Sequence, residues 1–236
     1  IGMSAYAEMT TGGAGVAVGH LALADCTTAN YNIGIGYRAG NHGNPPTTGA
    51  QNILIGAYGG LSASNGSEQI VMGYDVDGPA NSTFTFGSGG TDTSCVFGET
   101  SLSAPSDIRL KENISDATAG LSFINGLRPV NFRWKKEKDV PTEFKSYVAG
   151  SEARVMNEYE NNHGFIAQEV KVAMDADPSI KDGFGMWKLD GTGRQRVADA
   201  ALTPIFVKAI QELTTKIEVL EQEAGYHLDT IILDGT

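Results

Sequence analysis

The first hundred residues repeat a short pattern in which an apolar residue, any residue, a second apolar residue and a glycine follow one another. Residues two positions apart point to the same side of a β-strand, and glycine accepts the sharpest turns. Clusters rich in Asn, Gly, Pro and Asp separate the repeats. The pattern therefore predicts very short strands joined by turns, at residues 16–19, 33–36, 53–56, 70–73, 84–87 and 95–98.

A strand of three or four residues buries too little apolar surface to be stable by itself. Its partner is either the next repeat of the same chain or an identical chain wound together with it. We therefore expect residues 1–105 to form an all-β repeat stalk, and a monomeric β-solenoid is one of the alternatives. Loops 40–50 and 75–83 are candidate binding loops, because loops tolerate variation and often carry binding.

From residue 106 onward the pattern is that of an ordinary α+β domain. Asp116 is placed to cap a helix over 117–125. Strict alternation over 130–134 predicts a half-buried strand, and the charged, irregular residues 136–162 indicate a loop or a projecting hairpin. The remaining expected elements are a strand turning into a helix over 163–174 and a hairpin over 183–193.

The pattern then becomes helical, which predicts a terminal helix over about 202–224. Apolar residues there step by four, three, four and three positions, with charged and polar residues between them. Such a heptad seam is typical of helices that associate with copies of themselves. We therefore expect self-association of this helix, and the alternative is an amphipathic helix packed on its own domain. The seam residues are Phe206, Ile210, Leu213, Ile217 and Leu220.

Composition divides the chain at the same place as the pattern. Residues 1–105 contain one basic residue, Arg38, against seven acidic ones, and hold 20 of the 30 glycines, which favours a stalk with a polar surface. The formal net charge of −11 argues against binding to nucleic acid or to anionic membranes, and no apolar run is long enough for membrane insertion. Cys and His show no metal-ligand spacing, so we expect no metal and no cofactor. The chain starts at Ile1, and we expect a longer N-terminal part before it.

A hydroxyl and an amine stand at the boundary between the two compositions, on Ser106 and, five residues later, on Lys111. Serine and lysine are a minimal pair for nucleophilic peptide cleavage, in which the amine takes the hydroxyl proton. Only a neutral amine does so, which requires burial or a nearby positive charge. Arg109 could supply that charge, or it could neutralise Asp107 and fix the local backbone. Because residues five apart in an extended strand point to opposite faces, the segment must bend or the amine must come from another chain.

Four motifs that follow one another in order carry a family resemblance. They are Ser106-Asp107-Ile108-Arg109-Leu110-Lys111-Glu112-Asn113-Ile114, Leu127-Arg128-Pro129-Val130-Asn131-Phe132-Arg133-Trp134, Gly164-Phe165-Ile166-Ala167-Gln168-Glu169-Val170 and Leu202-Thr203-Pro204-Ile205-Phe206-Val207-Lys208-Ala209-Ile210-Gln211-Glu212-Leu213. Together they resemble the C-terminal intramolecular chaperone, or self-processing peptidase, domain of phage tailspikes and tail fibres of the endosialidase type. The resemblance covers about residues 106–225. The repeats at 32–40 and 52–56 resemble those of trimeric adhesin heads and phage tail fibres.

The resemblance implies a homotrimer in which residues 106–236 template the folding of the upstream fibre, residues 1–105, and then release themselves by serine autoproteolysis. By position, Ser106 is the nucleophile, Lys111 is its activating partner and Pro105–Ser106 is the cleaved bond. The residues expected to support them are Asp107, Arg109, His163 and Gln168.

The resemblance further implies a mixed architecture: a stalk that is a trimeric β-solenoid or interwoven β, and an α+β domain whose long terminal helix forms a trimeric coiled coil. It places the protein in a phage virion tail, assembled in the host cytoplasm. The stalk would then meet a host surface receptor, either a glycan or an outer-surface protein. The alternative is a non-cleaving trimeric adhesin or fibre in which the same domain is purely structural.

Overall fold

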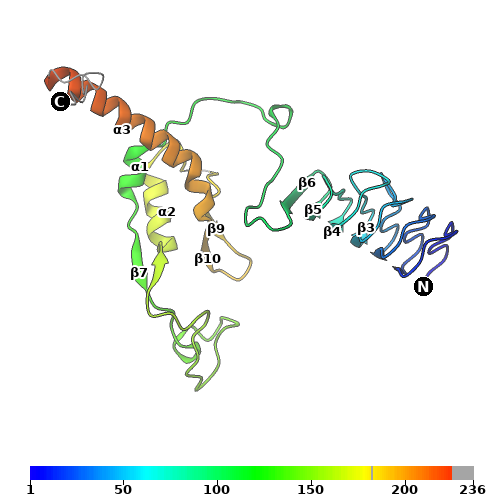
Figure 1. Ribbon diagram of the computed structural model, residues 1–236. Coiled ribbons are helices and arrows are strands. Elements are labelled where there is room, and N and C mark those ends of the chain that lie inside the picture. Colours follow the sequence, from blue (N-terminus) through cyan, green and yellow to red (C-terminus); the bar gives the residue numbers. More distant parts are fainter. Residues whose placement is uncertain (182, 225–236) are drawn as a thin grey trace, which may run out of the picture. The chain divides into compact units, whose positions relative to one another are not determined.

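The computed structural model describes residues 1–181 and 183–224, which form two compact units that divide between Asn113 and Ile114 (Figure 1). The boundary expected from the sequence, between residues 105 and 106, lies in the segment that leads out of the first unit, and it stays a prediction. The expected second domain, 106–236, includes residue 182 and residues 225–236, which lie outside the described residues.

The first unit is a β-solenoid. Five strands stack in chain order with parallel pairing, and one coil takes 14–20 residues. The five strands are β1 (Val16–Val18), β2 (Ile33–Ile35), β3 (Ile53–Ala57), β4 (Gln69–Tyr74) and β5 (Thr83–Ser88), and β6 (Thr91–Val96) follows them. The repeat pattern in the sequence thus predicted the first five strands correctly, each with the expected apolar residues.

The sixth strand is not a further coil of the solenoid. The pattern at 95–98 predicts a strand like the others, but β6 runs antiparallel to β5 and ends at Val96. Gly89, with a φ of 58°, and Gly90 lie between the two strands and allow a tight reversal. A hairpin therefore closes the stack, because antiparallel neighbours need only a short connection.

Small and branched apolar side chains fill the inside of the solenoid. One inward-facing residue in each of three strands, Ala17, Leu54 and Val71, is at most 7 % exposed. Leu23, which follows β1, is fully buried in the same cluster. Gly34 takes the inward position in β2, where a Cβ atom would lie 2.7 Å from Cγ of Leu23. The small residue at position 34 therefore leaves the space that the side chain of Leu23 fills.

A ladder of buried amides links the coils beside this core. Asn32, Asn52 and Gln69 are completely buried. Nδ2 of Asn52 donates to Oδ1 of Asn32 at 3.0 Å and to the carbonyl of Gly66 at 2.8 Å. Oδ1 of Asn52 accepts from the backbone N–H of Gln69 at 2.9 Å, and Nδ2 of Asn32 donates to the carbonyl of Gly49 at 2.8 Å. Because each amide bonds to the next coil, the ladder holds the coils in register.

A glycine lies near the C-terminal end of each of the first four strands, within or just after it, because the next coil approaches very closely there. Gly19, Gly36, Gly56 and Gly73 have φ values between 125° and 147°. A Cβ atom on Gly56 would lie 1.8 Å from the carbonyl oxygen of Gly73, and the other three positions are nearly as crowded. These glycines therefore serve coil stacking as well as chain reversal.

The other side of the parallel strands is also apolar. The register of the strands aligns two rows of side chains across the coils, and the residues of the second row are 37–40 % exposed. We call these rows the outer apolar face; they are Val16, Ile33, Ile53, Ile70 and Phe84, and Val18, Ile35, Ile55, Met72 and Phe86. A continuous apolar face of this kind on a sheet marks an interaction surface.

The second unit is an α+β domain. Its elements are α1 (Leu121–Gly126), β7 (Val130–Phe132), η2 (Glu137–Asp139), β8 (Asn162–Gly164), α2 (Ala167–Ala176), β9 (Trp187–Leu189), β10 (Gln195–Val197), η3 (Asp199–Leu202) and α3 (Thr203–Ala224). The strands pair as two antiparallel hairpins, β7 with β8 and β9 with β10. The helices pack around a core of Phe123, Val170, Met174, Met186, Leu202 and Ile205. Within residues 1–181 and 183–224, no helix is long and apolar enough to cross a bilayer.

The first helix of this unit begins later than the sequence indicates. Asp116 is exposed and lies outside the helix, which starts at Leu121 instead of residue 117. The backbone N–H of Leu121 donates to Oε2 of Glu212 on α3 at 2.9 Å. A carboxylate that is distant in the sequence therefore takes the place of the expected local cap.

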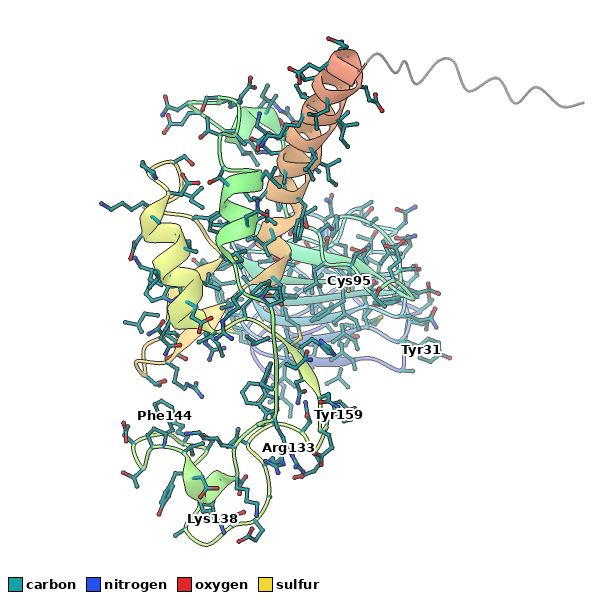
Figure 2. All side chains as sticks on the ribbon, turned by 90° about the vertical axis from the view of Figure 1, so that its left-hand side faces the viewer. Tyr31, Cys95, Arg133, Lys138, Phe144 and Tyr159 are labelled. Atoms are coloured by element: carbon teal, nitrogen blue, oxygen red, sulfur yellow. The ribbon has the colours of Figure 1, made fainter. Side chains whose placement is uncertain are left out.

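A long connection, residues 133–161, joins β7 to β8, as the charged and irregular sequence predicts. Figure 2 labels four of its residues, Arg133, Lys138, Phe144 and Tyr159. The carboxylate of Glu152 accepts hydrogen bonds from Lys136 and Lys138, which lower its pKa to about 2. Charge pairs therefore hold this connection in place where apolar packing does not.

Candidate functional site

Ser106 and Lys111 lie on a long exposed segment. Every residue from 96 to 118 is exposed. Ser103 still pairs with Ser94 of β6 through two backbone hydrogen bonds of 2.7 and 2.8 Å. Beyond it, the Pro105–Ser106 bond lies open to solvent in this single chain.

A short 3₁₀ turn, η1 (Ile108–Leu110), bends the chain between the two residues. Asp107 caps the turn, since its Oδ1 accepts from the N–H of Arg109 at 2.8 Å. The N–H of Lys111 donates to the carbonyl of Ile108 at 3.1 Å, and the chain becomes extended again at Lys111. The turn brings Nζ of Lys111 to 2.7 Å from Oγ of Ser106. The amine therefore reaches the hydroxyl within one chain, through the bend that the spacing requires.

Arg109 pairs with Asp107 and does not stand free beside the amine. Its Nε and one terminal nitrogen donate to the two carboxylate oxygens at 2.9 and 2.7 Å. This pair holds the pKa of Asp107 below its ordinary value and raises the pKa of Arg109. The sequence left two roles open for Arg109, a positive charge for Lys111 or a partner for Asp107. In the structure Arg109 neutralises Asp107 and fixes the turn.

The arrangement places a hydroxyl and an amine beside one peptide bond. A neutral amine at Lys111 would take the hydroxyl proton while Oγ of Ser106 attacks the carbonyl carbon of Pro105. Both side chains are exposed, whereas an amine becomes a base only when water around it is displaced or a positive charge lies near. The single chain therefore presents the reacting groups without the enclosure that would activate them.

The two other expected supporting residues belong to the second unit. His163 lies in β8 and Gln168 in the first turn of α2, and both are exposed. Their side chains are able to donate hydrogen bonds to an oxyanion. Their role next to Ser106 stays a prediction.

Comparison with known protein families gives one match. Residues 106–177 match the model of a peptidase family described as chaperone of endosialidase. The match begins at Ser106, which is the residue that the bend brings to Lys111. Residues 106–177 of this chain are therefore similar to an endosialidase-type chaperone domain. Searches of curated proteins and of solved structures found no match to the chain.

The terminal helix of the second unit, α3, carries two apolar surfaces. On one of them, Leu202 of η3 and Ile205 and Ala209 of α3 are at most 5 % exposed and pack inside the domain. On the other, the five seam residues are 43–62 % exposed. They are Phe206, Ile210, Leu213, Ile217 and Leu220. Packing on its own domain thus uses one surface and leaves the heptad seam in solvent.

The capping role of Asp107, in the first of the four motifs, was not predicted from the sequence. Asp107 acts as the N-cap of η1 and so builds the bend. An aspartate just before a turn is a known signal, because its carboxylate accepts the N–H two residues later. That signal was present at Asp107 and Arg109 and would have favoured the bend over an amine from another chain.

Proposed function

We propose that this chain is the C-terminal part of a phage tail fibre or tailspike whose chaperone domain trimerises, guides the folding of the β-solenoid before it and then releases itself by cutting Pro105–Ser106. The released domain would be residues 106–236, and the mature fibre would end at Pro105. The protein would then reside in the virion tail.

One observation carries the self-cleavage part of the proposal. A serine hydroxyl and a lysine amine lie 2.7 Å apart at the first residue of a domain whose family is classed among peptidases. A serine and a lysine five positions apart occur by chance in many proteins. Their contact, at the start of the family match and on an exposed segment, makes a chance pairing a poor explanation.

The proposed reaction balances without a cofactor. Oγ of Ser106 attacks the carbonyl carbon of Pro105, and Lys111 takes the hydroxyl proton and passes it to the departing amide nitrogen. The C–N bond between the two residues breaks, and an ester forms between the Pro105 acyl group and Oγ of Ser106. Water then hydrolyses the ester, which leaves a carboxylate on Pro105 and a free amine and hydroxyl on Ser106.

Two exposed apolar surfaces support trimerisation. The outer apolar face of the solenoid and the seam of α3 each present side chains that a single chain leaves in water. A folding aid would help the solenoid because each strand pairs with a strand 14–20 residues away, and loop closure costs entropy before those contacts form. A domain that holds three chain ends together lowers that cost.

Cleavage is tested on a denaturing gel and by mass spectrometry of the purified full-length chain. We expect two fragments from the parent, one with Ser106 as its first residue, and only intact chain from Ser106→Ala. Lys111→Arg should also abolish cleavage, since a guanidinium keeps its proton. Ser101→Ala, at another exposed serine of the same segment, is the matched control and should cleave like the parent. Cleavage that persists in Ser106→Ala would remove this residue from the mechanism.

Trimerisation is tested with Leu213→Lys. A charge in the middle of the seam should convert the trimer into monomers in size-exclusion chromatography with light scattering. The amount of soluble stalk should fall as well, because the folding aid is lost. Thr215→Lys places the same charge at an exposed position of the same helix but outside the seam, and it should leave the trimer intact. A Leu213→Lys protein that remains trimeric would contradict the role of the seam.

The exposure of Ser106 and Lys111 favours one other function, a non-cleaving trimeric fibre or adhesin in which the chaperone domain is purely structural. In that case the parent chain stays intact on the gel while Leu213→Lys still loses the trimer. The two experiments together therefore distinguish the two functions.

A further inference from the structure

A row of aromatic rings runs along one edge of the β-solenoid. His20, Tyr37, Tyr58 and Tyr74 lie at the ends of four successive strands, β1 to β4, where the chain leaves the sheet. The ring centroids of neighbours in this row are 5.4, 5.2 and 5.8 Å apart. We call these four residues the aromatic row. Its spacing follows from the stacking of the coils, since each coil adds one ring.

The aromatic row is not part of the core. Tyr37 is 44 % exposed and Tyr74 is 57 % exposed, whereas the core side chains of the solenoid are buried. Tyr58 stands between them with its ring nearly perpendicular to both, at 76° and 83°. Edge-to-face contacts of this kind fix the rings in orientation. The two exposed tyrosines are therefore held rigidly, about 10 Å apart by the spacing of the strands that carry them.

Polar side chains flank the aromatic row. The guanidinium of Arg38 lies 6.0 Å from the ring centre of Tyr58, which is a cation–π geometry. The ring of His42 lies 5.3 Å from the same tyrosine, and its Nδ1 is 3.6 Å from the carboxylate of Asp75. Together these groups offer hydrogen-bond donors and acceptors beside flat apolar rings.

This combination fits a carbohydrate. The C–H face of a sugar ring stacks on an aromatic ring, and its hydroxyls bond to guanidinium, imidazole and carboxylate groups. Two rigid rings separated by two coils match the span of a short extended oligosaccharide. A flat hydrophobic partner would need an uninterrupted apolar patch, which the charged groups of Arg38 and Asp75 break up.

The charge around the aromatic row narrows the class of carbohydrate. Arg38 is the single basic residue among residues 1–105, against seven acidic ones. Anionic glycans would meet net repulsion from this unit. We propose that the aromatic row is a binding surface for a neutral oligosaccharide, with Tyr37 and Tyr74 as the stacking platforms and Arg38, His42 and Asp75 as hydroxyl partners. This inference rests on the proposed role of the first unit as the fibre that meets a cell surface.

The inference is tested with the full chain on an array of neutral and acidic oligosaccharides built from hexoses and N-acetylhexosamines, followed by saturation-transfer NMR on the best neutral binder. We expect binding to neutral members and about tenfold weaker binding after Tyr37→Ala or Tyr74→Ala, since one aromatic contact contributes roughly that factor. Tyr37→Phe keeps the ring and should stay within about threefold of the parent. Saturation transfer should be strongest at the protons of the C–H face.

The matched control is Tyr31→Ala. Tyr31, labelled in Figure 2, is 63 % exposed and belongs to the same unit. It precedes β2 and is not one of the four rings of the aromatic row. This variant should bind like the parent, and all variants should keep the parent's assembly state in light scattering. No neutral binder on the array, a preference for acidic glycans, or equal losses in Tyr31→Ala and Tyr74→Ala would overturn the inference. None of these outcomes bears on cleavage at Ser106, which is read separately on the gel.

Discussion

Replacing Asn52 by alanine tests whether the amide ladder holds the solenoid together. The side chain of Asn52 makes three hydrogen bonds inside the solenoid, to Asn32, Gly66 and Gln69. The alanine variant removes all three. Oδ1 of Asn32 keeps one donor, because the backbone N–H of Asn52 also bonds to it at 3.0 Å. The carbonyl of Gly66 and the N–H of Gln69 lose their hydrogen bonds to the side chain of Asn52.

The expected cost follows from these two groups. A buried polar group that loses its partner costs about 1–3 kcal/mol, so two of them cost about 2–6 kcal/mol. Even the lower end is a large fraction of the ~5–15 kcal/mol that stabilises an ordinary domain. Because about 1.4 kcal/mol corresponds to a factor of ten, amides that exchange by opening of the coils should exchange at least about thirtyfold faster.

Hydrogen exchange followed by mass spectrometry measures this effect in the full chain. Peptides that cover β3 and β4 should lose protection, while peptides from α2 and α3 in the second unit should not change. Asn30→Ala is the matched control, because Oδ1 of Asn30 also links two coils, through the N–H of Gly13 at 2.9 Å, but does so in solvent. Its effect should stay below about threefold, as expected for an exposed hydrogen bond.

The reasoning would be refuted by similar protection in Asn52→Ala and Asn30→Ala. That result would mean that backbone pairing alone sets the register of the coils and that the buried amides contribute nothing net. A loss of protection that spreads equally to the second unit would also contradict it, since the ladder lies within the first unit.

Two further predictions concern the same unit. Gly56→Ala should prevent stable stacking of the coils, because its Cβ would lie 1.8 Å from the carbonyl oxygen of Gly73, whereas Gly90→Ala, with no atom within 4 Å, should melt within a few degrees of the parent in circular dichroism. Burial, with a smaller effect of Cys26, raises the pKa of Tyr6 to about 12. A raised pKa in the folded state favours the protonated phenol, so its contribution to stability is complete below about pH 10 and is lost as the pH rises toward 12. Near-ultraviolet absorbance should show a tyrosine that ionises late and is missing in Tyr6→Phe, and an unchanged titration curve in that variant would disprove the assignment.

The local sequence pattern was sufficient to predict the short strands that pair with strands of similar sequence. The alternation at Ile53, Leu54 and Ile55 predicts a strand with one buried side chain and two on the opposite side. Stacking similar short strands is the simplest way to bury the side chain of Leu54. The bend at Asp107 was also within reach, because the turn depends on a carboxylate and an N–H two residues apart. The heptad spacing of α3 likewise predicted a helix whose apolar seam its own domain leaves exposed.

Distance in the sequence explains what the pattern missed. The strand at 95–98 looked like another repeat, but two glycines allowed a reversal, and only pairing with β5 decided that β6 runs antiparallel. The start of α1 depends on Glu212, which lies far along the chain from Leu121, so the local cap at Asp116 was a misleading signal. The aromatic row needed the register of four coils before separate tyrosines became neighbours.

The sequence alone determined the division into a β-repeat stalk and an α+β domain, the strands of the first five coils, the terminal helix and the pair Ser106 and Lys111. These follow from periodicity, composition and motif order, which act over a few residues. Only the tertiary structure decided that buried amides join the coils and that tyrosines from separate coils form one row. Such features depend on contacts between coils and across turns, where side chains meet because the backbone has already brought them together.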